Sequence, residues 1–128
     1  MPALIVQKDP NARKLWRKAL LQRGFRVTST DCMDQARART DPGRPLDLVL
    51  LDLCDDTPGR LNFASATAET RPDCHFILLT GAARQDPETL RRTVPPRSTV
   101  LRKPVDIERI AAELDALGAR LSQDASRG

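Results

Sequence analysis

The sequence predicts an α/β fold, a five-stranded parallel sheet with helices on both of its faces. Short apolar runs alternate with segments of helical periodicity along the chain, and no second periodic block follows them. The apolar runs are nearly continuous, which is typical of strands that are covered on both faces. The 128 residues have the length of one domain, which we place at residues 1–120, with a flexible polar tail at 121–128.

Five segments are expected to form the strands. The strongest is residues 46–53, an apolar run broken only by Asp47 before Asp52 appears near its carboxyl end. The other four are shorter runs of apolar or β-branched residues bounded by turn-forming residues. They are residues 3–6, 25–28, 75–79 and 99–102.

The first helix is expected to start at Asp9 and Pro10 and to end at Gly24. Asp9 can accept hydrogen bonds from the free amides of the first turn, and Pro10 takes a position whose N–H would be unpaired. Glycine suits the left-handed conformation that closes many helices. Residues at helical spacing are expected to form the buried stripe of this helix: Ala12, Leu15, Trp16, Ala19 and Leu20.

Three more helices are expected between the later strands. Residues 32–40 predict a modest second helix. A turn-rich acidic segment at 54–60 precedes a short third helix that ends near Glu69. The pair Asp86-Pro87 repeats the start signal of the first helix and predicts a short fourth one.

A fifth helix is expected after the last strand. Asp106 can cap its start, and the Leu117-Gly118 pair is expected to loosen its end. Apolar residues recur at helical spacing between these points: Ile107, Ile110, Ala111, Leu114 and Leu117.

Composition narrows the function classes. The net charge of +4 favours encounters with anionic partners, but the basic residues are scattered and only 3% of residues are aromatic, so direct nucleic-acid contact is disfavoured. We expect a cytoplasmic protein, because no basic leader or long apolar stretch is present. The chain contains three cysteines, Cys32, Cys54 and Cys74. Because their number is odd and their spacing is not that of metal ligands, we expect free thiols in a reducing compartment.

Three polar side chains are expected at the carboxyl edge of the sheet, where open parallel sheets bind ligands. Asp52 ends the third strand, Thr80 follows the fourth and Lys103 the fifth. A carboxylate, a hydroxyl and an ammonium group in one crevice suit covalent phosphoryl transfer, in which the carboxylate attacks phosphorus. The same spacing is explained if Asp52 and Lys103 form an ordinary ion pair and Thr80 caps a strand end. The phosphoryl-transfer interpretation and this structural one both stay open.

Four motifs along residues 3–120 resemble the response-regulator receiver family of two-component signalling. They are ALIVQKDP, DLVLLDL, FILLTG and VLRKP, each at the end of its own expected strand. The resemblance implies the flavodoxin-like topology of the family. It also implies that Asp52 accepts a phosphoryl group, that Thr80 moves toward that group as the switch, and that Lys103 contacts it.

The sequence departs from the family at the acidic pair that binds magnesium. Gln7 and Lys8 stand in the place of the two acids, and Lys8 and Lys103 together outweigh the charge of Asp52. A hard divalent cation needs oxygen ligands and negative charge. Magnesium binding is therefore expected to be weak or absent, and no cofactor is expected.

Two alternatives to ordinary magnesium binding remain. Asp55 or Asp56, in the loop after the third strand, replaces the missing ligands from an unusual direction. Alternatively, the Lys8 ammonium group occupies the place of the metal, pairs with Asp52 and holds one conformation without phosphorylation. We favour the second alternative.

The sequence thus predicts an atypical receiver that acts as a signalling and protein-interaction module, without enzymatic activity beyond accepting a phosphoryl group at Asp52. Its expected partners are a histidine kinase, a phosphotransfer protein or a downstream effector, and the face of the fourth and fifth helices is a candidate homodimer contact. A conventional phosphorylation-switched regulator is the alternative. A small nucleotide-binding domain has less support, because the sequence contains neither GxGxxG after the first strand nor GxxxxGK[ST].

Overall fold

The computed structural model of the chain describes residues 1–40, 43–53, 57–81 and 92–127. Its sheet consists of five parallel strands in the order β2-β1-β3-β4-β5. The strands are β1 (Pro2–Val6), β2 (Arg26–Thr30), β3 (Leu48–Asp52), β4 (His75–Thr80) and β5 (Ser98–Arg102). The predicted five-stranded parallel sheet is therefore confirmed, with strand ends displaced by no more than two residues.

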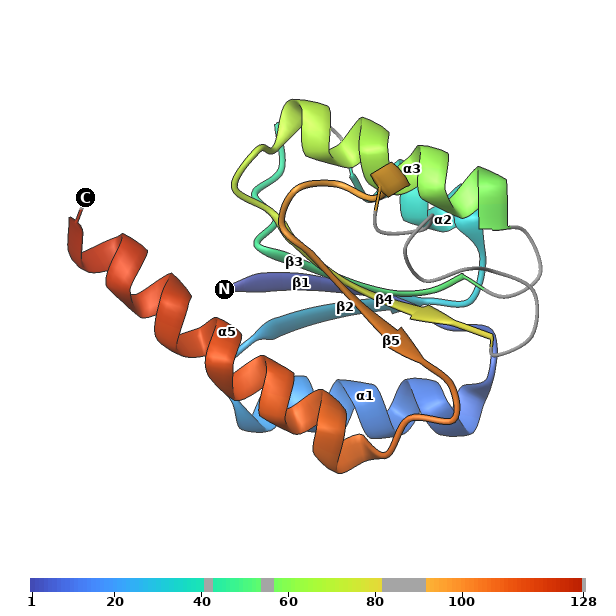
Figure 1. Cartoon of the computed structure of the whole chain (residues 1–128), viewed down its shortest axis with the longest axis horizontal. Coiled ribbons are helices and arrows are strands. Elements are labelled where there is room, and N and C mark those ends of the chain that lie inside the picture. The colour runs from blue at the N-terminus through green and yellow to red at the C-terminus, as the bar shows by residue number, and fades with distance from the viewer. Residues whose placement is uncertain (41–42, 54–56, 82–91, 128) are drawn as a thin grey trace.

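Helices cover both faces of the sheet, as predicted. α1 (Pro10–Gln22) and α5 (Ile107–Arg127) lie on one face, and α2 (Met33–Ala38) and α3 (Thr57–Thr70) on the other (Figure 1). β3 pairs with β1 on one side and β4 on the other, and helices cover both of its faces, so all of its residues are buried. Because the strands are parallel, their carboxyl ends meet at one edge of the sheet.

The central strands divide the core into two layers. Leu50 packs with Trp16 in the layer under α1 and α5, whereas Leu51 packs with Phe63 in the layer facing α2 and α3. Successive side chains of a strand point to opposite faces. Asp52 therefore lies on the same face as Leu50, toward the layer of α1 and α5.

The start of α1 agrees with the prediction. Asp9 is the N-cap residue, and its Oδ1 accepts a hydrogen bond from the N–H of Asn11 at 3.1 Å. Pro10 takes the first helical position. Gly24 follows the helix with a φ of 84°, a conformation that other residues adopt at a cost.

The predicted buried stripe of α1 is wrong at one position. Trp16, Ala19 and Leu20 are buried, but Leu15 is 54% exposed. Successive helical residues are turned by about 100° about the axis. With Trp16 at the centre of the buried stripe, Leu15 therefore faces solvent.

α3 begins earlier than predicted. Residues 57–60, which were predicted as part of a turn-rich segment, form its first turn, so that part of the prediction is wrong. Pro58 is tolerated there because the first N–H groups of a helix have no intrahelical acceptor. Residues 54–56 lie outside the described residues.

α5 runs further than predicted. Its start after Asp106 agrees, since the carbonyl of Asp106 accepts from the N–H of Ile110 at 3.3 Å. The expected end at Gly118 is wrong, because the helix continues to Arg127 through the segment expected as a tail. A glycine inside a helix costs only about 1 kcal/mol. Leu121 extends the apolar stripe and packs against the core.

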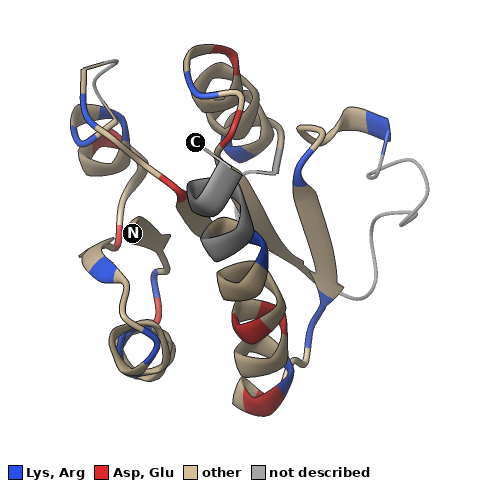
Figure 2. Ribbon diagram, turned by 90° about the vertical axis from the view of Figure 1, so that its left-hand side faces the viewer, with Lys and Arg blue, Asp and Glu red and all other residues tan. Residues whose placement is uncertain are grey.

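Positive charge is spread over the molecule. Figure 2 shows Lys and Arg positions on helices of both layers and on strand ends, which agrees with the scattered distribution expected from the sequence. None of the described helices is both long enough and apolar enough to span a membrane. The predicted start of the fourth helix, Asp86-Pro87, falls outside the described part of the chain.

The described cysteines are free thiols. Cys32 is half-buried and Cys74 is buried, and Cys54 lies outside the described residues. Burial raises the pKa of the Cys74 thiol to about 12. It therefore stays protonated near neutral pH, and a protonated thiol is a poor nucleophile.

Candidate functional site

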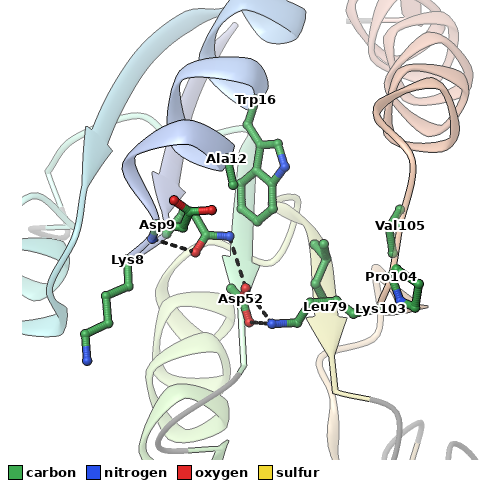
Figure 3. Close-up of a pocket in the computed structure, with 10 residues that line it drawn as sticks. Lys8, Asp9, Ala12, Trp16, Asp52, Leu79, Lys103, Pro104 and Val105 are labelled. Carbon is green, nitrogen blue, oxygen red and sulfur yellow. Dashed lines mark hydrogen bonds and ion pairs between the residues drawn. The ribbon is translucent and has the colours of Figure 1, made fainter.

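A pocket of about 660 Å³ opens at the carboxyl edge of the sheet, on the face covered by α1 and α5. It lies between the loop after β1, the first turns of α1, the ends of β3 and β4 and the loop after β5. Asp52 enters it from β3, and Trp16 of α1 forms part of its wall (Figure 3). The peptide bond between Lys103 and Pro104, which both line the pocket, is cis.

Asp52 and Lys103 form an ion pair in this pocket. The Nζ atom of Lys103 lies 2.8 Å from Oδ1 and 2.8 Å from Oδ2 of Asp52. Asp52 is only 3% exposed, whereas the side chain of Lys103 is 32% exposed. A carboxylate buried to this degree needs a charged partner, because an unpaired charge is costly away from water. The structure thus brings the predicted site residues Asp52 and Lys103 into direct contact.

Gln7 is the second side chain that contacts the Asp52 carboxylate. It is 4% exposed, and its Nε2 donates to Oδ2 of Asp52 at 3.0 Å. Its Oε1 accepts from the backbone N–H of Asp9 at 3.1 Å, and its own carbonyl accepts from a guanidinium N–H of Arg13 at 2.9 Å. The amide is therefore held at both ends and presents a donor, not an oxygen, to Asp52.

The structure differs from the hypothesis that Lys8 pairs with Asp52. Lys8 is exposed and its side chain extends away from Asp52 (Figure 3). The ion pair with Asp52 is formed by Lys103 instead. Neighbouring side chains at the end of an extended strand point to opposite sides. Because Gln7 points inward to Asp52, Lys8 is turned outward.

Thr80 lies at the end of β4, as predicted, and its backbone carbonyl accepts a hydrogen bond from the N–H of Lys103 at 2.8 Å. Its hydroxyl donates to the carbonyl of Gly81 at 3.4 Å, and it is not among the described residues that line the pocket. β4 places Leu79 beside Asp52 in the pocket, and alternation along the strand turns Thr80 to the other face.

Arg60 is a residue that sequence reasoning missed. It lies in the first turns of α3, is 5% exposed, and donates from its guanidinium group to the backbone carbonyl of Asp52 at 2.6 Å. Its Nε has no hydrogen-bond partner among the described residues. A signal was present, because Arg60 is the sole charged residue between Asp56 and Glu69 and lies four residues before the buried Ala64.

Comparisons with solved structures show what this arrangement resembles. A CheY-like response regulator receiver domain protein from Methanospirillum hungatei JF-1 superposes with a TM-score of 0.76 at 20% identity, covering 99% of this chain and 98% of that one. A response regulator from Thermotoga maritima gives 0.73 at 18% identity, covering 92% and 97%. The chain has the receiver fold.

A third structure adds a chemical comparison. It is a response regulator protein from Burkholderia pseudomallei with a phosphorylated aspartic acid, a calcium ion and citrate. This chain matches it with a TM-score of 0.71 at 20% identity, covering 97% of this chain and 72% of that one. No protein-family model matches the sequence, and no curated protein matches it either.

The described side chains at the edge of this receiver fold do not fit a divalent cation. In the described part of the chain, no three acidic, histidine or cysteine residues are grouped closely enough to hold a metal ion. Both oxygens of Asp52 contact Lys103, and the Asp9 carboxylate caps α1. Magnesium needs several hard oxygen ligands. The alternative ligands Asp55 and Asp56 lie outside the described residues.

Proposed function

We propose that this chain is an atypical receiver domain of two-component or phosphorelay signalling that acts as a protein-interaction module. The supporting observation is that both carboxylate oxygens of Asp52 contact Lys103 and that Oδ2 also accepts from Gln7. A carboxylate that attacks phosphorus must present a free oxygen. In the proposal, the Asp52–Lys103 pair holds the binding surface in one conformation without phosphorylation.

The charge around Asp52 supports a module that does not use magnesium. The charged residues that line the pocket balance, since Asp9 and Asp52 are matched by Lys8 and Lys103, and the buried Arg60 adds a positive charge behind Asp52. A divalent cation entering beside Asp52 would therefore lack the excess negative charge that hard cations need. No enzymatic activity is proposed for this module, and acceptance of a phosphoryl group at Asp52 belongs to the second candidate function.

The proposed partners are a histidine kinase, a phosphotransfer protein or a downstream effector in the cytoplasm. A homodimer through the face of the fourth and fifth helices stays part of the proposal. α5 supplies exposed residues to that face, and the segment expected to form the fourth helix lies largely outside the described residues.

A conventional phosphorylation-switched regulator is the second candidate. It is favoured by the open pocket beside Asp52, which has room for a phosphoryl group, and by the phosphorylated aspartic acid in the Burkholderia pseudomallei structure. In this candidate the ammonium group of Lys103 would leave one oxygen of Asp52 and contact the phosphoryl oxygens instead.

Phosphorylation of Asp52 separates the two candidates. We expect that incubation with acetyl phosphate, with or without magnesium, adds no phosphoryl group to the wild-type chain, because Lys103 and Gln7 cover the carboxylate. Intact-mass measurement of wild type and Asp52→Ala checks this. A mass gain of one phosphoryl group in the wild type that is missing from Asp52→Ala would establish the conventional candidate.

Magnesium titration tests the metal-free part of the proposal. Trp16 is buried in the wall of the pocket, so its fluorescence should report a cation that binds beside Asp52. We expect the fluorescence and the thermal stability of the wild type to stay unchanged as magnesium is added. The double variant Gln7→Asp/Lys8→Asp restores the acidic pair and should gain a saturable response. A saturable response of the wild type would contradict the proposal.

A further inference from the structure

A second concave site lies at the opposite edge of the sheet from Asp52. It is a groove of about 280 Å³ beside the amino ends of β1 and β2 and the end of α2. Three arginines line it: Arg26 at the start of β2, Arg39 at the C-cap of α2, and Arg44 in the segment before β3. All three are exposed, so the groove is strongly positive and open to solvent.

The three arginines of the groove have no acidic partner among the described residues, a property that they share with Arg17, Arg102 and Arg120. Within the described residues, no ion pair or side-chain hydrogen bond involves the guanidinium groups of Arg26, Arg39 or Arg44. Four other arginines do have acidic partners: Arg23 with Asp115, Arg37 with Asp34, Arg97 with Asp73, and Arg109 with Glu113. What sets Arg26, Arg39 and Arg44 apart is that they line one groove. Three like charges around one groove repel each other, and a bound anion would relieve that repulsion.

The chemistry of the groove favours carboxylates carried by a polypeptide. The guanidinium group of arginine matches the geometry of a carboxylate with two parallel hydrogen bonds. Between the arginines lie apolar surfaces, among them Pro2, Val27 and Pro45, which suit the stems of acidic side chains. None of the described residues that line the groove is aromatic, so the described lining offers no ring to stack on a nucleic-acid base.

The strand beside the groove is suited to an extended ligand. β2 is at the edge of the sheet. The N–H of Arg26 and the carbonyl of Thr30 bond toward the β1 side. Alternate residues of a strand turn their backbone groups to opposite sides, so Val27 and Ser29 turn theirs to the outer edge. An extended peptide can add to such an edge through its backbone.

We propose that this groove binds an extended acidic segment of a partner protein, with its carboxylates paired to Arg26, Arg39 and Arg44. This binding is separate from the chemistry of Asp52 and does not rest on the function proposed above. It gives the module a docking surface at the amino edge of the sheet.

A pair of charge-matched variants tests the proposal. The probe is a dye-labelled, blocked hexaglutamate peptide, with hexaglutamine as the uncharged control, and binding is measured by fluorescence anisotropy at low and physiological salt. We expect Arg39→Ala/Arg44→Ala to weaken hexaglutamate binding about tenfold, as the loss of two partly exposed ion pairs implies. The variant Lys14→Ala/Lys18→Ala removes the same charge from α1 and should change binding less than about twofold.

Three results would overturn the proposal. Equal losses in the two double variants would mean that the peptide follows net charge alone. Absence of saturable hexaglutamate binding at low salt would mean that the groove does not take acidic peptides. Tighter binding of a single-stranded oligonucleotide, lost in Arg39→Ala/Arg44→Ala, would identify a nucleic-acid phosphate site instead. Circular dichroism of each variant establishes that it is folded.

Discussion

Replacing Lys103 by methionine is expected to lower the free energy of unfolding by about 2 kcal/mol, because it leaves the Asp52 carboxylate buried without its cation. Asp52 is 3% exposed, and after the change the neutral amide of Gln7 still donates to its Oδ2. The expected loss is below that of a fully buried pair because the Lys103 side chain is 32% exposed and partly screened by water. Urea denaturation followed by Trp16 fluorescence measures it.

Two variants accompany this measurement. Asp52→Asn/Lys103→Met removes both charges and should recover most of the lost stability, since a buried amide costs less than a buried carboxylate. Lys8→Met changes an exposed lysine that extends away from Asp52 and should alter stability by less than about 0.5 kcal/mol. A Lys8→Met loss as large as that of Lys103→Met would restore Lys8 as the partner of Asp52.

Trp16→Ala is expected to destabilise the domain by about 4 kcal/mol, the largest effect that we predict for a single residue. Trp16 is buried in the layer under α1 and α5 and also forms part of the wall of the Asp52 pocket. Its truncation leaves a cavity that the surrounding residues of the sheet can fill only in part. Urea denaturation followed by far-ultraviolet circular dichroism measures the change without a tryptophan signal.

Leu15→Ala is the matched control for Trp16→Ala. Leu15 adjoins Trp16 in α1 but is 54% exposed, so its truncation should change stability by less than about 0.5 kcal/mol. A loss above about 2 kcal/mol in Leu15→Ala would mean that this leucine is buried, as the sequence alone predicted. The two adjacent residues therefore test the orientation of α1 directly.

The α/β class, the parallel sheet and the edge that carries the site were predictable from the sequence. Apolar runs, helix-start signals such as Asp9-Pro10, and strand ends are local patterns that do not depend on distant residues. Parallel topology then brings Asp52 and Lys103 to the same edge whatever the details of packing. The substitution of Gln7 and Lys8 for acids is likewise visible in the chain itself.

Local sequence patterns gave the wrong prediction in two cases. In one, two adjacent residues of a helix both fitted the buried stripe, and in the other, a small difference in free energy decided where a helix ends. Leu15 and Trp16 both satisfy a helical stripe, and only packing against the sheet selects Trp16. Gly118 has a weak helix propensity, which the packing of Leu121 outweighs.

The sequence by itself determined the order and kind of the elements and the charges that could meet at the carboxyl edge. Only the tertiary structure decided which of those charges do meet. Lys103 reaches Asp52, Lys8 turns outward, and Arg60 enters from α3 to hold the backbone of Asp52. The reason is physical, since an ion pair depends on the direction in which each side chain leaves its element, and that direction is set by the packing of the whole sheet.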